Sequence, residues 1–193
     1  MKHIISKSCA DAQAYIVPFR VGSHRGVSIT PEIDAAVDLA INGSFGGNLG
    51  ETYAMTLPAG DKLTSIILLG LGADRLSVRD IHTKAAPAFK QAKQLGAKHV
   101  AVMLDQLSEL SESAELFGAL ARLPQLVGYT NSGLKSNPEN KNFEQVAFVT
   151  AADGLDAALS EAVANARGTI TERSGCNRPR HDNRTQAMQP KIK

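Results

Sequence analysis

Two glycine-rich stretches are the part of this sequence best suited to chemistry, because closely spaced glycines can hold a phosphate group on their backbone amides. The first stretch runs from Gly43 to Gly50, and the second is the Gly70-Leu-Gly72 turn. The second follows an apolar run and precedes a helical pattern, as in dinucleotide-binding proteins. The candidates for a ligand-binding role are Gly46, Gly47, Gly70 and Gly72.

The dinucleotide fingerprint is incomplete in the second stretch. It needs a small residue three positions after the second glycine, and Arg75 occupies that position. Asp105, the acidic residue available to a ribose, lies farther on than the roughly 20 residues that this contact requires. The first stretch leads into a strand pattern and not onto a helix N-terminus. We therefore interpret both stretches as turns of the chain, and expect no cofactor on them.

Residues for metal or nucleophilic catalysis are scattered along the chain. No pair has the HxxxH or HxxE spacing that places two metal ligands on one helical face, and there is no GxSxG nucleophile motif. Cys9 lies in a turn, and Cys176 lies in a tail whose nearest histidine does not form a rigid dyad with it. The histidines are His3, His24, His82, His99 and His181. We expect no catalytic and no metal-binding residue.

Composition excludes several functional classes. The chain has 193 residues, and its 21 basic and 19 acidic residues give a formal net charge of +2, which does not favour nucleic acid or membrane partners. The 2 cysteines suggest neither a disulfide framework nor a zinc ribbon. No apolar run reaches the roughly 18 residues of a membrane span. We expect a soluble, cytoplasmic protein.

A strand–helix–strand unit from Thr64 to Leu104 must position the glycines. Its first strand is apolar and β-branched, as in a strand buried on both faces. Ser77, with Asp80 three residues later, predicts a capped helix start. Pro87 falls inside the helical pattern, so we expect a kink or a restart near Lys84. The unit predicts a crossover between two neighbouring parallel strands.

The segments before this unit predict two short strands, a helix and a hairpin. Met1 to Ser6 and Ala14 to Val17 are strand candidates that could pair as a hairpin. Thr30, followed by Pro31, begins a helix that ends at Asn42 and Gly43. A second hairpin joins Tyr53–Leu57 to the strand at Thr64.

The segments after the unit predict two helices and a strand. A helix follows Ser111 and is stopped by Pro124, Phe143 to Thr150 form a strand, and Asp153 caps a last helix. Residues 126–136 have no clear pattern, and 137–142 read as a surface loop. The prediction is a three-layer α/β fold with a mixed, mostly parallel sheet and helices on both faces. Residues 1–172 form the domain and 173–193 form a linker or tail.

Three segments together resemble the N-terminal domain of the leucyl (cytosol) aminopeptidase family. Ser65–Gly72, with the capped helix and Lys98–Met103, resembles the central unit of that domain. Tyr129 to Ser136 is similar to the family's Tyr-x-Phe-x-x-Tyr-Lys segment, with Asn131 and Leu134 replacing two aromatic residues. Ala162 to Pro179 resembles the long helix that enters the catalytic domain through an Arg-Asp-Leu-x-Asn-x-Pro motif. Arg173, Asn177 and Pro179 match this motif, whereas Ser174 and Gly175 depart from it.

This resemblance implies a larger enzyme. Members of the family are two-metal exopeptidases that release N-terminal amino acids, are usually hexameric, and use two divalent metals, zinc or manganese, in a C-terminal catalytic domain. We expect that catalytic domain to be absent from this chain and to be its main partner. The chain itself is then a non-catalytic domain with a role in oligomer assembly and substrate access.

The resemblance also implies an alternative. The family's N-terminal domain is similar to macro domains, which bind ADP-ribose on glycine-rich loops at strand ends. The alternative function is therefore a macro-domain-like ADP-ribose or nucleotide-binding module that uses the four candidate glycines, an expectation that rests on analogy of fold. In some family members the domain contributes to DNA binding, which the near-neutral charge does not support.

Overall fold

A mixed six-stranded sheet forms the centre of the structure. The computed structural model describes residues 1–8, 12–22, 29–59, 61–129 and 142–176. In spatial order the strands are β1 (Lys2–Ser6), β6 (Gln145–Val149), β5 (His99–Met103), β2 (Ala14–Phe19), β4 (Lys62–Gly70) and β3 (Thr52–Ala59). Each pair of neighbours is parallel except β3 and β4. The predicted mixed, mostly parallel sheet is confirmed.

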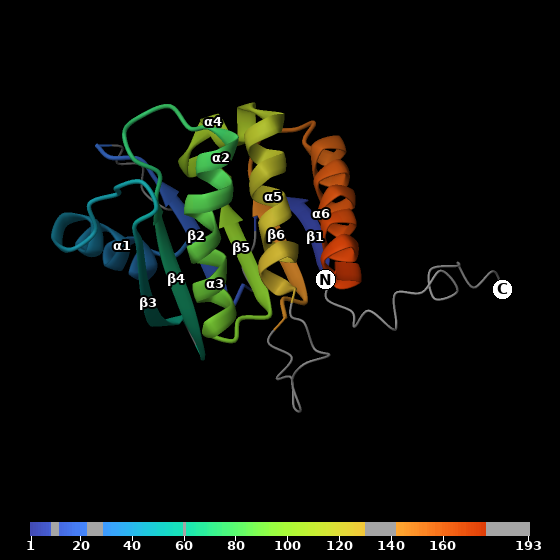
Figure 1. Cartoon of the computed structure of the whole chain (residues 1–193). Coiled ribbons are helices and arrows are strands. Elements are labelled where there is room, and N and C mark those ends of the chain that lie inside the picture. The colour runs from blue at the N-terminus through green and yellow to red at the C-terminus, as the bar shows by residue number, and fades with distance from the viewer. Residues whose placement is uncertain (9–11, 23–28, 60, 130–141, 177–193) are drawn as a thin grey trace, which may run out of the picture.

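Helices cover both faces of this sheet and complete three layers. Figure 1 shows α3, α5 and α6 side by side over one face, with α1 near β3 and β4, away from those helices. The helices are α1 (Pro31–Gly43), α2 (Val78–Asp80), the π-helical turn η1 (Ile81–Ala85), α3 (Ala86–Gln94), the 3-10 turn η2 (Leu104–Gln106), α4 (Ser108–Glu112), α5 (Ala114–Gly128) and α6 (Asp156–Cys176).

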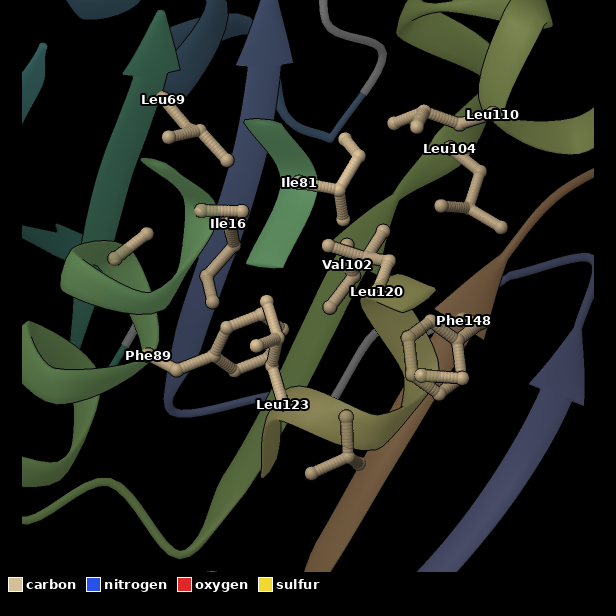
Figure 2. Close-up of a cluster of buried hydrophobic side chains, with 14 of the residues drawn as sticks. Ile16, Leu69, Ile81, Phe89, Val102, Leu104, Leu110, Leu120, Leu123 and Phe148 are labelled. Carbon is tan, nitrogen blue, oxygen red and sulfur yellow. The ribbon is translucent and has the colours of Figure 1, made fainter. Parts of the chain in front are cut away.

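Alternation along the strands divides the core into two clusters. Ile67 and Leu69 of β4 point to the face covered by α3, α5 and α6, and Ile66 and Leu68 point to the face covered by α1. Figure 2 shows the larger cluster, where Leu69 lies with side chains from β2, β5, β6 and the covering helices. A strand with both faces buried reads as a continuous apolar run, which explains the β4 sequence.

The predicted hairpin between the first two strands is wrong. Strand β1 pairs in parallel with β6, from Lys2 opposite Gln145 to Ser6 opposite Val149. Strand β2 lies between β4 and β5, and all 6 of its residues are buried. A strand this apolar is stabilised in the middle of the sheet, where both of its edges and both of its faces are covered.

The central unit forms as predicted, with one correction. Ser77 and Asp80 make both hydrogen bonds of a capping box. The break expected near Lys84 is the π-helical turn η1. Helix α3 begins after it, with Pro87 in its first turn. At that position the N–H group that proline lacks would not have made a hydrogen bond within the α-helix. The two strands of the unit, β4 and β5, are parallel but not neighbours, because β2 lies between them.

Three helix boundaries also differ from the sequence prediction. Ser111 does not precede the helix but lies inside α4, and the cap of α5 is Ser113. Pro124 does not stop α5, which continues to Gly128 with Pro124 buried inside it. Helix α6 begins at Asp156 rather than beside Asp153, and it continues to Cys176. The buried side chains that hold these helices on the core outweigh the loss of one hydrogen bond at Pro124. The predictions for residues 130–141 and 177–193 lie outside the described residues.

Candidate functional site

The two glycine-rich stretches meet at the carboxyl end of the parallel strands. The amide of Gly72 donates to the carbonyl of Gly47 at 3.0 Å, and the amide of Gly50 donates to the carbonyl of Gly70 at 2.8 Å. The Gly70 amide donates to the Glu51 carbonyl at 2.8 Å. The structure therefore brings all four candidate glycines into one cluster, although they lie on segments more than 20 residues apart.

Close backbone packing explains why these positions are glycines. A Cβ atom on Gly70 would lie 2.1 Å from the Asn48 carbonyl oxygen and 2.6 Å from the Gly47 carbonyl carbon. Gly47 and Gly72 have φ angles of 72° and 69°, in the left-handed region that side chains disfavour. The two loops thus pack directly on each other, and the glycines serve this contact.

The loop amides already have an anion from the chain itself. The carboxylate of Glu51 accepts hydrogen bonds from the Gly46 amide at 3.0 Å and from the Asn48 amide at 2.9 Å, with a further bond from Asn48 Nδ2 at 3.0 Å. The backbone hydrogen bonds lower the pKa of Glu51, which stays ionised. A phosphate on this loop would have to displace that carboxylate, so the geometry does not favour the ADP-ribose alternative.

A small pocket beside the loop has no free charged group. It measures about 230 Å³ and is lined by Phe19, Phe45, Ile41 and the backbone near Gly46. Arg20 also lines it, but its guanidinium donates to the carbonyls of Ala73 and Asp74 at 2.9 Å each and to the Glu109 carboxylate. Arg20 therefore holds the β4–α2 connection in place.

The remaining residues considered for chemistry do not converge. Asp105 accepts from the Thr150 hydroxyl at 2.7 Å and from the Ala151 amide at 2.9 Å, so it joins the ends of β5 and β6. His99 lies 3.7 Å from Glu144 at the opposite, amino-terminal end of the parallel strands. Within the described part of the chain, no three His, Cys, Asp or Glu side chains gather in a way that could hold a metal ion. His24, His181 and Cys9 lie outside that part.

A second hollow, which no sequence motif predicts, lies among α2, α5 and α6. It measures about 390 Å³ and is lined mainly by small side chains, together with Glu115, Arg122 and Glu161. The signal in the sequence is a pair of small residues one helical turn apart on each helix, Ala114 with Gly118 and Ala158 with Ala162.

The architecture defines the class of protein before any comparison. A mostly parallel sheet between helical layers is an α/β domain, and none of the described helices is long and apolar enough to cross a membrane. The particular family follows from sequence: the profile described as "Cytosol aminopeptidase family, N-terminal domain" matches residues 34–138. The chain belongs to this family. No curated protein sequence matches it.

Solved structures share the fold. A tomato leucine aminopeptidase mutant superposes with a TM-score of 0.71 at 19% identity, over 95% of this chain and 39% of the tomato chain. The Bottromycin maturation enzyme BotP superposes with a TM-score of 0.66 at 18% identity, over 91% of this chain and 35% of its own. The 193 residues therefore span well under half the length of these enzymes.

Proposed function

We propose that this chain serves as the non-catalytic N-terminal domain of a leucyl aminopeptidase, a two-metal exopeptidase that releases N-terminal amino acids. The observation that carries this proposal is the family match over residues 34–138. It is supported by the superposition on 39% of a leucine aminopeptidase chain. In this proposal the partner catalytic domain supplies the zinc or manganese site.

The role that we assign to the domain is oligomer assembly and control of substrate access in the cytoplasm. Its main partner is the catalytic domain, and residues 173–193 are the proposed link to it. Helix α6, which ends at Cys176, is the element through which the domain would be joined.

Hydrolysis of leucine amide by the purified 193-residue chain with manganese tests the assignment. We expect no release of ammonia above the rate without protein, with an active leucine aminopeptidase as the positive control. Turnover that a metal chelator abolishes would contradict the non-catalytic role.

Light scattering after size-exclusion chromatography tests the assembly role separately. We expect a species larger than the 20.5 kDa monomer that dissociates on dilution. A monomer at every concentration would leave the family assignment intact but remove the assembly role from this domain.

A further inference from the structure

The groove among α2, α5 and α6 has the size of a small-molecule site. Its volume of about 390 Å³ falls within the range of roughly 300–1,000 Å³ that ligand pockets occupy. Helices α5 and α6 lie side by side over the same face of the sheet in Figure 1, and both follow parallel strands. The groove is open at the N-terminal halves of these two helices.

Small side chains create the space. Ala114 and Gly118 line the groove from α5, and Ala158 and Ala162 line it from α6. Gly118 belongs to the buried residues, yet a Cβ atom built on it would meet no other atom within 4 Å, leaving the backbone of its own helix aside. The position that a larger side chain would fill is therefore empty.

One cationic side chain, Arg122, lines this groove. The Nε atom of Arg122 is inaccessible to solvent and has no hydrogen bond. The ion pairs among the described residues do not include Arg122. Because the Nε atom is covered by the protein, a ligand carboxylate in the groove would meet the terminal nitrogens of the half-buried Arg122 guanidinium. No described residue supplies an acceptor to these nitrogens, and their planar arrangement matches a carboxylate in shape and charge.

Two carboxylates stand at the rim of the same groove, one on each helix. Glu115 and Glu161 are exposed, and neither forms an ion pair with a described residue. Among the described residues, Glu161 accepts one long hydrogen bond, from Asn165 Nδ2 at 3.5 Å. One unpaired cation and two unpaired carboxylates in a single groove complement a ligand that carries both an anionic and a cationic group.

We infer that this groove binds a small aliphatic zwitterion. The ligand's carboxylate accepts from the Arg122 guanidinium, its ammonium group lies near Glu115 and Glu161, and its alkyl group lies against the alanines and Val78. This inference goes beyond the proposed function, which requires no ligand on this domain.

L-valine is the probe that tests the site, with two analogues that each keep one half of the charge pattern. In a titration of the full chain followed by two-dimensional amide NMR, L-valine should shift the Gly118, Ala158 and Ala162 resonances saturably. Isovaleric acid lacks the ammonium group and isobutylamine lacks the carboxylate, and each should bind at least tenfold more weakly. Equal binding by either analogue, or no saturable shift at about 50 mM L-valine, would overturn the inference.

Three variants separate binding from folding. Arg122→Gln should weaken L-valine at least tenfold. Gly118→Leu should abolish binding by filling the groove while keeping the fold, because leucine favours a helix more than glycine does. Gly168→Leu is the matched control, since Gly168 is an exposed glycine of α6 outside the groove with open space at its Cβ. Wild-type affinity in Arg122→Gln, or in a folded Gly118→Leu, contradicts the site.

His82 provides an independent readout in the neighbouring π-helical turn. Burial, and after it the positive charge of Arg122, holds the pKa of His82 below its usual value. A carboxylate bound to Arg122 offsets that charge, so L-valine should raise the pKa of His82 in an NMR titration, and isobutylamine should not. An unchanged pKa at saturating L-valine would show that the carboxylate binds elsewhere and would overturn the assignment to Arg122.

Discussion

Replacing Gly70 with alanine distinguishes a packing role of the glycine cluster from a binding role. The new Cβ atom would lie 2.1 Å from the carbonyl oxygen of Asn48 and 2.6 Å from a backbone carbon of Gly47, so the loop must move. This movement strains the Gly50–Gly70 and Gly72–Gly47 hydrogen bonds. Overpacking costs about 1–3 kcal/mol, and two weakened hydrogen bonds add about 2 kcal/mol. We expect a loss of about 3–5 kcal/mol in the free energy of unfolding.

Urea denaturation followed by circular dichroism measures this loss. Thermal unfolding gives a second measure. For a chain of this size, each 1 kcal/mol lost from the free energy of unfolding lowers Tm by about 2–4 °C, so the Tm of Gly70→Ala should lie about 6–20 °C below that of the wild type. Gly43→Ala is the matched control, because Gly43 ends helix α1 with no atom within 4 Å of its Cβ position. This control should remain within about 1 kcal/mol of the wild type, on the stabilised side.

Two results would refute the packing account. A Gly70→Ala protein within about 0.5 kcal/mol of the wild type would show that the loop accommodates a side chain freely. Stabilisation of the wild type by millimolar ADP-ribose, lost in Gly70→Ala, would instead show that the loop holds a diphosphate in spite of Glu51.

Three further substitutions test the cap, the core and the pH dependence. Ser77→Ala removes the capping box and should cost about 1 kcal/mol in urea denaturation; no change would mean that the cap does not stabilise the helix. Phe148→Ala removes a buried ring that meets Phe117 edge-on at 5.3 Å and should cost about 3–5 kcal/mol, whereas a loss below 1 kcal/mol would indicate a core that collapses freely. Burial, and after it nearby positive charge, lowers the pKa of His3 from 6.5 to about 4, so the unfolded chain binds more protons between these values. Stability should therefore fall as the pH drops from 6.5 to 4, and His3→Gln should lose this part of the slope; an equal slope in both proteins would contradict the assignment.

Features that depend on neighbouring residues could be predicted from the sequence. The capping box at Ser77, the hairpin before Thr64 and the helix break near Lys84 each follow from residue types within a few positions. The structure confirms all three. The effect of Pro87 is local, because the π-helical turn before it places the proline at a position where no hydrogen bond of α3 is lost.

Strand pairing could not be predicted in the same way. An apolar run predicts a strand but does not name its partners, and the partner of β1 lies at the other end of the described chain. Pro18 obscured the length of β2, because proline lacks the donor that a central strand needs. The pairing of β2 with β5 ends at Ile16, so Pro18 lies beyond the last pair of that ladder.

The groove on α5 and α6 could not be predicted from sequence motifs either, because it too depends on which elements pack together. Its spacing signal, two small residues one turn apart on each helix, is equally typical of tight helix packing. Whether Arg122 has a partner depends on side chains from three helices, which only the folded arrangement reveals.

The pairing of the first strand with the last has a consequence during biosynthesis. Lys2 pairs with Gln145, 143 positions later in the chain. At translation rates of about 5–20 residues per second, β1 waits roughly 7–30 s for its partner after leaving the ribosome. Throughout that time its isoleucines and its backbone hydrogen-bonding groups are available to chaperones and to other nascent chains. Strand β1 therefore pairs with β6 and forms the edge of the sheet only when synthesis of the domain is nearly complete.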